Sequence, residues 1–477
     1  MAWLGIDLGT QGVRAVLLDD SGTVLGRGSA ALEPGRRDGT RHEQDPGQWW
    51  IALGAASRQA LDGAAAPDGV AVDGTSGTVL VQDRDGSPRS AALMYDDARA
   101  HGDLESVQRA GASLWSELGY RMQASWALPK VRWLVREGAL GPGDRIAHQA
   151  DHIAGRLAGH PVPTDTSNAL KTGYDLLRRC WPADVLELVG IPAGALPEVV
   201  VPGTRVGEVS AAAAAHTGIP AGTPVSAGMT DGCAAQIAAG ALEPGAWSSA
   251  LGTTLVVKGC TAELLHDPAG AVYSHLNPDG GWLPGGASST GAGVLAREFP
   301  GADLNRLTVE ASLDEPAPGV CYPLAGRGER FPFVAPEATG FAEGVGDEPA
   351  ARLAATLQGV ALIERLAYDR LAALGADTRG PVTFSGGATR NPQWTQLRAD
   401  ILGRRVLLPE TVEAAAGMAV LAAAPPGALA ATARRMVRVA ATVDPDPERG
   451  ARFEPAYERL CAALAERGWL TPVGSAR

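Results

Sequence analysis

Two acidic residues stand where the surrounding pattern predicts strand ends. Asp7 lies near the end of the apolar segment 2–8, just before a glycine-rich turn, and Asp231 follows the apolar segment 225–230. Acids are poor strand residues, and ligands of α/β sheets collect at the carboxyl ends of strands. Two carboxylates that meet at such an edge suit phosphoryl transfer to an alcohol, because one can order Mg²⁺ while the other accepts the hydroxyl proton.

Ordinary structural roles also account for both acids. Aspartate is a favoured residue before a helix, so Asp231 can simply cap the small-residue helix expected at 232–241, although Thr230 offers another cap. Asp7 can belong to a plain hairpin with a turn-facing acid. The residues alone leave these alternatives open.

The turn after Asp7 has the composition of a phosphate cradle. Gly9 and Gly12 allow close backbone approach to a ligand, and Thr10 and Gln11 add side-chain donors. Segment 246–257 repeats this arrangement, with Leu-Gly-Thr at 251–253 matching Leu-Gly-Thr at 8–10. The repeat predicts two related domains, each opened by a glycine hairpin.

A third glycine-rich loop follows the expected strand 382–384. Gly386 and Gly387 admit a flat ring against the backbone, and Asn391 and Trp394 can bond to and stack on adenine. The alternative is an ordinary loop before a helix, because Asn391 followed by proline is a good helix start.

The pattern of apolar residues predicts the elements that must position these groups. Alternation indicates strands at 2–8, 13–19 and 23–25, and a short buried strand at 70–73, and helical spacing covers 49–61. The longest helical pattern runs from 352 to 374 and stops at Gly375.

Composition excludes several classes of function. A length of 477 residues favours two or three domains, and a net charge of -12 argues against nonspecific nucleic-acid binding. The first residues have no basic lead and no apolar run reaches about 18 residues, so we expect neither a signal peptide nor a membrane span. Five scattered cysteines favour a reducing cytoplasm. None of the three lysines follows a glycine, which excludes a Gly-x-x-x-x-Gly-Lys phosphate loop.

His148 and His152 have the i, i+4 spacing of a zinc-binding helix. Gln149 occupies the position at which such a helix carries its catalytic glutamate, and no third ligand is evident. We therefore interpret this segment as a polar helix face.

The chain resembles the FGGY carbohydrate kinases of the actin/sugar-kinase/Hsp70 superfamily over essentially its whole length. The motifs that carry the resemblance occur in order at 5–10, 42–46, 72–78, 228–232, 251–254, 385–387 and 443–448. The resemblance implies an α/β fold of two ribonuclease-H-like domains around a central cleft. We expect an N-terminal sugar-binding domain at 1–242, an ATP-binding domain at 243–430 and a helical tail at 431–477.

The resemblance also implies roles for individual residues. Asp231 is the expected general base, Asp7 is expected to orient Mg²⁺ and phosphate, and both acids are candidate Mg²⁺ ligands. The sugar-binding residues implied are Thr75, Ser76, Asp97 and Gly232. The ATP-binding residues implied are Thr10, Gln11, Gly12, Gly252, Thr253, Thr254, Gly386, Gly387, Asn391 and Trp394.

Several stretches favour one branch of the family. The sugar-side Trp-x-Asp-x-Arg pattern of many members is replaced here by Tyr-Asp-Asp-Ala-Arg at 95–99. Segments 73–80, 167–174, 273–275 and 327–332 resemble the D-ribulokinase-like branch of plants and cyanobacteria, which implies D-ribulose as the substrate. The alternatives are D-xylulose or another ketose or polyol, and a nucleotide-dependent sugar sensor without kinase activity. We expect a cytoplasmic monomer or homodimer that binds a sugar and ATP and neither nucleic acid nor membranes.

Overall fold

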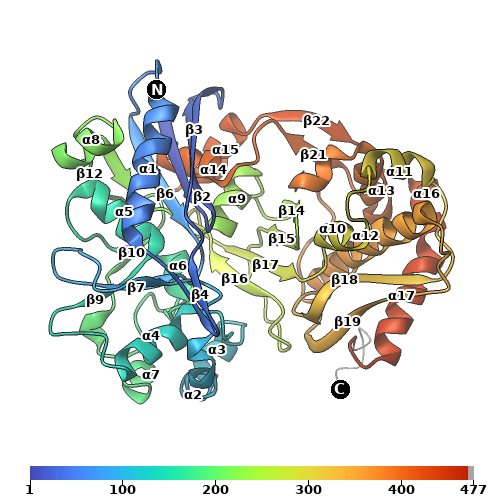
Figure 1. Cartoon of the computed structure of the whole chain (residues 1–477), viewed down its shortest axis with the longest axis horizontal. Helices are drawn as coiled ribbons and strands as arrows, with labels where there is room; N and C mark the ends of the chain where they lie inside the picture. Colours follow the sequence, from blue (N-terminus) through green and yellow to red (C-terminus); the bar gives the residue numbers. More distant parts are fainter. Residues whose placement is uncertain (471–477) are drawn as a thin grey trace. The chain divides into compact units, whose positions relative to one another are not determined.

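A computed structural model describes residues 1–470, which divide into two compact units (Figure 1). Unit 1 comprises Met1–Leu242, His275–Gly281 and Thr411–Arg438. Unit 2 comprises Glu243–Ser274, Trp282–Glu410 and the described residues from Val439 onward.

Unit 1 is built on a six-stranded sheet of order β12-β13-β6-β1-β2-β3. The opening meander is confirmed, since β1 pairs antiparallel with β2 and β2 pairs antiparallel with β3. On the other side of β1, β6 and β13 run parallel to it and β12 runs antiparallel. The strands are β1 (Ala2–Leu8), β2 (Gly12–Asp19), β3 (Val24–Ala31), β6 (Gly69–Gly74), β12 (Arg205–Glu208) and β13 (Pro224–Ser226).

Unit 2 repeats this topology. Its large sheet includes the run β17-β15-β14-β20-β21-β22. From β17 to β14 the neighbouring strands are antiparallel, from β14 to β21 they are parallel, and β22 is antiparallel to β21. Read from β3 to β12, the sheet of unit 1 has the same sequence of pairings. The strands are β14 (Trp247–Leu251), β15 (Leu255–Gly259), β17 (Trp282–Ser288), β20 (Val382–Ser385), β21 (Val406–Pro409) and β22 (Val439–Val443). The predicted pair of related α/β domains is therefore confirmed.

The remaining elements surround these sheets. A five-stranded sheet in unit 1 contains β4 (Arg36–Asp38), β5 (Arg41–Gln44), β8 (Ala92–Leu93), β7 (Val79–Gln82) and β9 (Arg145–His148). The other strands are β10 (Thr164–Asp165), β11 (Val199–Val200), β16 (Tyr273–Leu276), β18 (Val320–Glu329) and β19 (Ala335–Glu343). The helices of unit 1 are α1 (Pro46–Leu61), α2 (Leu104–Ala110), α3 (Ala112–Glu117), α4 (Ala127–Arg136), α5 (Gln149–Ala158), α6 (Thr166–Leu170), α7 (Ala183–Leu188), α8 (Ala211–Thr217), α9 (Asp231–Ala238), α14 (Ala414–Ala423) and α15 (Leu429–Met436). The helices of unit 2 are α10 (Gly293–Glu298), α11 (Leu304–Glu310), α12 (Pro349–Ala373), α13 (Pro392–Leu402), α16 (Pro447–Arg452) and α17 (Glu454–Glu466). The described 3₁₀ turns are η1 (Arg99–Asp103), η2 (Ala193–Ala195) and η3 (Gly387–Arg390).

The compact units differ from the boundaries expected at 243–430 and 431–477. The apolar helix α14, drawn orange-red in Figure 1, packs against β1 and against α9, so residues 411–438 belong to unit 1. The sequence could not show this return, because an alanine-rich helix fits any apolar face. The end of the expected tail, 471–477, lies outside the described residues.

Small residues allow α14 to approach both neighbours closely. A Cβ on Gly5 of β1 would lie 1.7 Å from the carbonyl oxygen of Ala415, and a Cβ on Gly417 would lie 2.0 Å from that of Ala234 in α9. Helix α14 thus packs closely between the strand that carries Asp7 and the helix that begins at Asp231.

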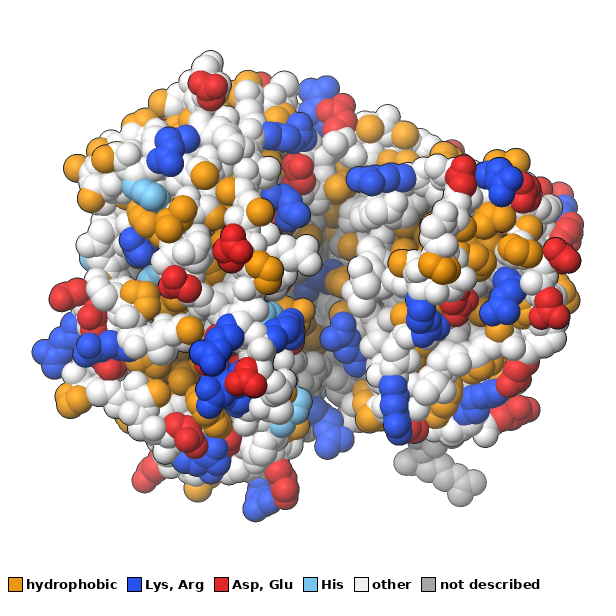
Figure 2. Space-filling view, viewed as in Figure 1, with side chains coloured by type: hydrophobic (Ala, Val, Ile, Leu, Met, Phe, Trp, Pro, Cys, Tyr) orange, Lys and Arg blue, Asp and Glu red, His pale blue; other side chains and the backbone are white. Residues whose placement is uncertain are grey.

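No helix within residues 1–470 is long and apolar enough to cross a membrane. On the face drawn in Figure 2, acidic and basic side chains are interspersed.

We predict that Gly5→Ala destabilises unit 1, because the added methyl group meets the backbone of α14 rather than a side chain that can move. Overpacking of this kind costs about 1–3 kcal/mol of unfolding free energy. Thermal and denaturant unfolding measure the change. Gly194→Ala is the matched control, since a Cβ there meets no atom within 4 Å; equal stability of the two variants would contradict the close packing of α14.

Candidate active site

Two carboxyl groups lie opposite each other at the ends of neighbouring strands in unit 1. In the parallel register of β1 and β6, Asp7 faces Asp73. Both strands point the same way, so their carboxyl ends share one edge of the sheet. Asp7 is nearly buried and Asp73 is completely buried.

The third strand brings Asp231 to the same edge. Thr230 forms a parallel bridge with Gly74 and is the residue before the first turn of α9, which begins at Asp231. Strand β13 itself ends earlier than predicted, at Ser226. A Cβ on Gly228 would lie 1.8 Å from the carbonyl oxygen of Val72, so the connecting segment follows β6 closely up to the edge.

The sequence analysis did not place Asp73 in the site. Neither of its carboxyl oxygens has a hydrogen-bond partner among the described residues. Burial, followed by the charges of Asp7 and Asp231, raises the pKa of Asp73 well above its usual value. The sequence did contain a signal for Asp73, because it ends the apolar segment 70–73 just as Asp7 lies near the end of segment 2–8.

Burial also raises the pKa of Asp231, and the nearby Asp7 charge adds to the effect. The cation of Lys171 and backbone N–H donors from Gly232 and Ser76 act in the opposite direction. The Gly232 amide donates to Asp231 Oδ1 at 2.7 Å. Lys171 is therefore part of the electrostatic site, although the sequence analysis gave it no role.

A short hydrogen-bonded chain fixes the backbone beside Asp231. The Thr230 amide donates to the Ser167 hydroxyl at 2.9 Å, and that hydroxyl donates to Asp165 Oδ1 at 2.5 Å. Asp165 is itself buried and caps α6. The start of α9 is thus held from α6 as well as from β6.

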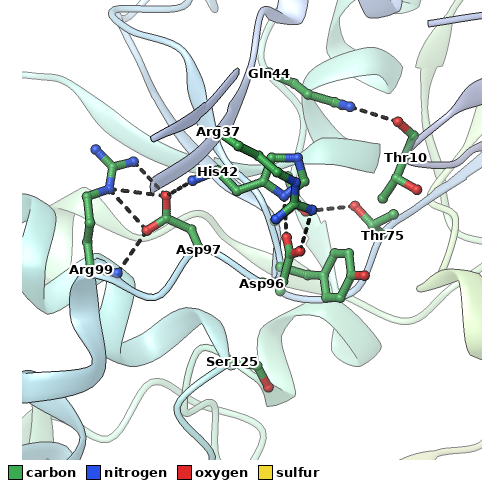
Figure 3. Close-up of polar contacts among 12 residues, drawn as sticks. Thr10, Arg37, His42, Gln44, Thr75, Asp96, Asp97, Arg99 and Ser125 are labelled. Carbon is green, nitrogen blue, oxygen red and sulfur yellow. Dashed lines mark hydrogen bonds and ion pairs between the residues drawn. The ribbon is translucent and has the colours of Figure 1, made fainter. Parts of the chain in front are cut away.

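The turn 9–12 has the geometry of a tight hairpin between β1 and β2. The Gly9 amide donates to the carbonyl oxygen of Gly12 at 3.0 Å, and the Gln44 side chain donates to the carbonyl oxygen of Thr10 at 2.8 Å (Figure 3). Gln11 is exposed, and Arg14 pairs with Asp7 at 3.2 Å. The side chain of Gln44 therefore fixes the backbone of the turn, while Gln11 at its tip stays exposed.

The arrangement suits a magnesium ion that also binds phosphate. Within residues 1–470 no three His, Cys, Asp or Glu side chains are grouped so that they could hold a metal. Mg²⁺ ordinarily keeps several waters and binds through one or two carboxylates together with substrate phosphates. Asp7 and Asp231 are the carboxylates at this edge that could hold such an ion.

The two expected sugar contacts after β6 differ in availability. The Thr75 hydroxyl is hydrogen-bonded to Gln149 at 2.6 Å and to Thr78 at 2.7 Å. The Ser76 hydroxyl has no hydrogen-bond partner within the described chain. Ser76 is therefore the better placed of the two to bind a ligand hydroxyl.

Asp97 is fully buried and its carboxylate is already occupied. Arg99 donates to both carboxylate oxygens, and the His42 amide donates to Oδ2 at 2.8 Å (Figure 3). The neighbouring Asp96 is hydrogen-bonded to His42 and to Arg37, and these contacts hold its pKa below the usual value although burial opposes them. Arg99 and the His42 amide therefore already bond to the Asp97 oxygens, which a motif of adjacent acids could not show. Contact of Asp97 with a sugar stays a prediction.

In unit 2, the hairpin at 251–255 is locked by a second loop. The Ala292 amide donates to the carbonyl oxygen of Gly252 at 2.8 Å, and the Gly293 amide donates to that of Thr253 at 3.1 Å. Thr253 is exposed, and Thr254 is half-buried.

A buried carboxylate, Glu329, holds this second loop. It accepts hydrogen bonds from the hydroxyls of Ser288, Thr290 and Tyr322 at 2.8, 3.1 and 2.9 Å. It also accepts from the amides of Ser289 and Arg330 at 2.7 and 2.9 Å. The carbonyl oxygen of Thr290 in turn accepts from the Leu255 amide at 2.8 Å, which connects Glu329 to the hairpin.

The third glycine-rich loop lies against the same hairpin. Gly386 has φ 88°, and a Cβ there would lie 2.4 Å from the carbonyl oxygen of Leu251, whereas a Cβ on Gly387 meets open space. Asn391 caps α13 by accepting from the Trp394 amide. The Trp394 ring is buried and its Nε1 donates to the carbonyl oxygen of Leu357 at 3.0 Å, so it is not free to stack on a base.

The two histidines with zinc-helix spacing are buried polar residues. The ring nitrogens of His148 bond to Asp151, Thr164 and Thr172. The His152 ring lies edge-on to Trp49, and burial lowers its pKa to about 4.

Comparison with known proteins agrees with this geometry. Residues 2–238 match the N-terminal domain of the FGGY family of carbohydrate kinases, and residues 248–425 match its C-terminal domain. A xylulose kinase from Streptomyces rubiginosus is 29% identical over 486 residues, covering 99% of this chain and 98% of the relative. A second, from Streptomyces coelicolor, is 30% identical over 423 residues, covering 86% and 85%.

A solved structure of a xylulose kinase from Rhodospirillum rubrum superposes with a TM-score of 0.85 at 25% identity, covering 98% of this chain and 99% of that chain. The family models together span most of the sequence, and both units have counterparts in that structure. The chain therefore belongs to the FGGY family of carbohydrate kinases, which are phosphotransferases, and has the family's two-domain, actin- and Hsp70-like α/β fold.

Proposed function

We propose that the protein transfers the γ-phosphoryl group of ATP to the terminal hydroxyl of a ketopentose. The observation that carries the proposal is the convergence of Asp7 and Asp231 at one edge of the unit 1 sheet. Phosphoryl transfer needs little covalent chemistry from a protein and depends on positioning and charge stabilisation, which such a pair of acids provides.

Asp231 acts as the general base. Its carboxylate accepts the hydroxyl proton as the sugar oxygen bonds to phosphorus and the bond between phosphorus and the ADP oxygen breaks. The amides of Ser76 and Gly232 orient this carboxylate, and the Ser76 hydroxyl binds the sugar beside it.

Asp7 and the turn 9–12 face the transferred phosphate. Asp7 is the principal residue to hold Mg²⁺, with Asp231 as a second carboxylate near it. A Mg²⁺ ion held there would neutralise charge that develops on the phosphate oxygens. Thr10, Gln11 and Gly12 contribute donors at the accessible tip of the turn.

The loops of unit 2 bind the nucleotide. Gly252, Thr253 and Thr254 contact phosphates, and Gly386 with Gly387 provides the flat surface for adenosine. Asn391 contributes by shaping the start of α13 rather than through a free amide, since its side chain already bonds to Trp394 and Thr308.

Two ketopentoses are candidates for the substrate. The segments at 73–80 and 167–174 favour D-ribulose, which would give D-ribulose 5-phosphate. D-Xylulose is the second candidate, because the two relatives compared above are named xylulose kinases. A comparison of kcat/KM for D-ribulose, D-xylulose, other ketoses and polyols decides between them. ADP release that no sugar stimulates would instead favour a nucleotide-dependent sugar sensor.

We predict that Asp231→Ala lowers sugar-dependent turnover by roughly 10²–10⁴-fold, the usual contribution of a general base. ATP binding, measured by calorimetry, should persist, because the nucleotide is held by unit 2. Asp62→Ala, which removes an exposed acid after α1, should leave turnover unchanged. Near-normal sugar phosphorylation by Asp231→Ala would refute the assignment.

We predict that Lys171→Met moves the acid limb of the kcat/KM profile to higher pH. A base with a raised pKa loses activity as the pH falls through that pKa, and Lys171 now lowers the pKa of Asp231. Without the cation, protonation of Asp231 begins at a higher pH. Lys258→Met in unit 2 is the control, and the acid limb of its kcat/KM profile should lie at the wild-type pH. An acid limb at the wild-type pH in Lys171→Met would contradict an electrostatic effect of Lys171 on Asp231.

We predict that Glu329→Ala raises KM for ATP by about tenfold, which corresponds to about 1.4 kcal/mol of lost binding. The loop 288–293 loses its anchor, whereas the sugar residues lie in unit 1, so KM for the sugar should change little. Glu329→Gln should restore part of the affinity, because an amide oxygen still accepts from the Ser289 and Arg330 amides.

Glu343→Gln controls for loss of an acid in unit 2, since Glu343 only pairs with Arg467 at the surface. Equal changes in the two Michaelis constants of Glu329→Ala would show a general structural defect and not an effect on the phosphate hairpin.

A further inference from the structure

A buried ammonium group joins three loops of unit 1. Lys130 lies in α4 and its side chain is completely buried. Its Nζ donates to the carbonyl oxygens of Gly77 at 2.9 Å, Tyr95 at 2.7 Å and Ser125 at 2.9 Å. These acceptors belong to the loop after β6, the loop after β8 and the turn before α4.

The geometry of this site is specific to lysine. An ammonium has three donors around one atom, and the three carbonyl oxygens use all of them. A guanidinium is planar and spreads its donors in a fork, so it cannot satisfy three oxygens that converge on one point. The chain otherwise uses arginine almost throughout, since only three of its 41 basic residues are lysines.

Each loop that Lys130 holds reaches the proposed sugar site or its supports. Gly77 follows Ser76, whose amide donates to Asp231. Tyr95 precedes Asp96, which pairs with Arg37 and His42, and Figure 3 shows Ser125 below this group. One buried atom therefore fixes the Ser76 loop relative to the Asp96 and Ser125 loops.

We propose that Lys130 is a positioning residue for the sugar, whose ammonium fixes the Ser76 loop of the proposed sugar site relative to the Tyr95 and Ser125 loops that support it. The proposal rests on the proposed function. Lys130 is not a catalytic residue, because its three protons are committed to backbone carbonyls. Its contribution is the placement of Ser76 and of the general base beside the sugar hydroxyls.

The surroundings of Lys130 make its charged form unfavourable. Burial lowers its pKa to about 7 and Lys171 adds repulsion, while Asp97 and Asp96 favour the charged form. A cation kept in such surroundings without a directly bonded carboxylate is stabilised mainly by the carbonyl oxygens. Those oxygens are consequently held firmly by it.

The test compares Lys130→Met and Lys130→Arg with the wild-type protein. For the ketopentose that the wild-type enzyme phosphorylates best, both variants should raise KM by roughly tenfold to hundredfold, the effect of an ångström-scale misplacement. KM for ATP should stay within about twofold. Arg398→Met is the matched control, because it breaks a buried ion pair with Glu364 in unit 2; it should lower the melting temperature without changing KM for the sugar.

Hydrogen–deuterium exchange supplies a readout that needs no activity. In both variants, amides at 75–78, 94–98 and 123–126 should exchange faster, while those of β1 and β2 stay protected. Wild-type exchange in these loops together with an unchanged KM for the sugar would overturn the proposal. Absence of sugar phosphorylation by the wild-type protein would refute the proposed function and would leave the exchange result to decide on Lys130.

A measurement on the wild-type protein covers the case in which the variants do not fold. Saturating sugar, with D-ribulose and D-xylulose tested separately, should slow exchange in all three loops together. Protection by either sugar that is confined to segments outside these loops would overturn the proposal.

Discussion

The structure depends on keeping mutually repelling carboxyl groups together at one partly dehydrated sheet edge. Asp7, Asp73 and Asp231 each raise the cost of charging a neighbour, and burial adds to it. Backbone amides and Lys171 offset part of this cost at Asp231, whereas burial and the charges of Asp7 and Asp231 raise the pKa of Asp73 well above its usual value. Carboxylates held in this way are suited to a reaction in which a hydroxyl group loses its proton and receives a phosphoryl group.

Rigid packing behind the edge makes this arrangement possible. Helix α14 lies so close to β1 and α9 that Gly5 and Gly417 leave no room for a methyl group. The strand that carries Asp7 and the helix that carries Asp231 therefore share one support. On the other side, Ser167 and Lys130 hold the backbone next to Asp231 and Ser76 through buried hydrogen bonds. In unit 2, Glu329 accepts hydrogen bonds from hydroxyls and amides of the loop that holds the hairpin 251–255.

Regular patterns were predictable from the sequence, whereas long-range contacts were not. Alternation identified β1 and β2, the repeated Leu-Gly-Thr turn indicated related domains, and acids at strand ends located Asp7 and Asp231. The return of α14 to unit 1 was missed, because its ten residues are apolar on all sides and carry no direction. Lys171 and Lys130 were missed for a related reason: a lysine becomes part of a site through its surroundings in space. Asn391, Trp394 and Asp97 serve here as a helix cap, a core ring and a member of a buried ion pair. The same residue types occur in ligand sites, so the sequence alone could not distinguish these structural roles from ligand contacts.

A crystal structure of the protein with Mg²⁺, a non-hydrolysable ATP analogue and the preferred ketopentose tests the central claim most directly. The account predicts an Asp231 carboxylate oxygen at about 2.6–3.2 Å from the terminal sugar hydroxyl, the reach of a general base. It also predicts Asp7 beside the ion or one of its waters. A sugar whose terminal hydroxyl contacts neither Asp231 nor a water held by it would contradict the account, whatever the nucleotide contacts.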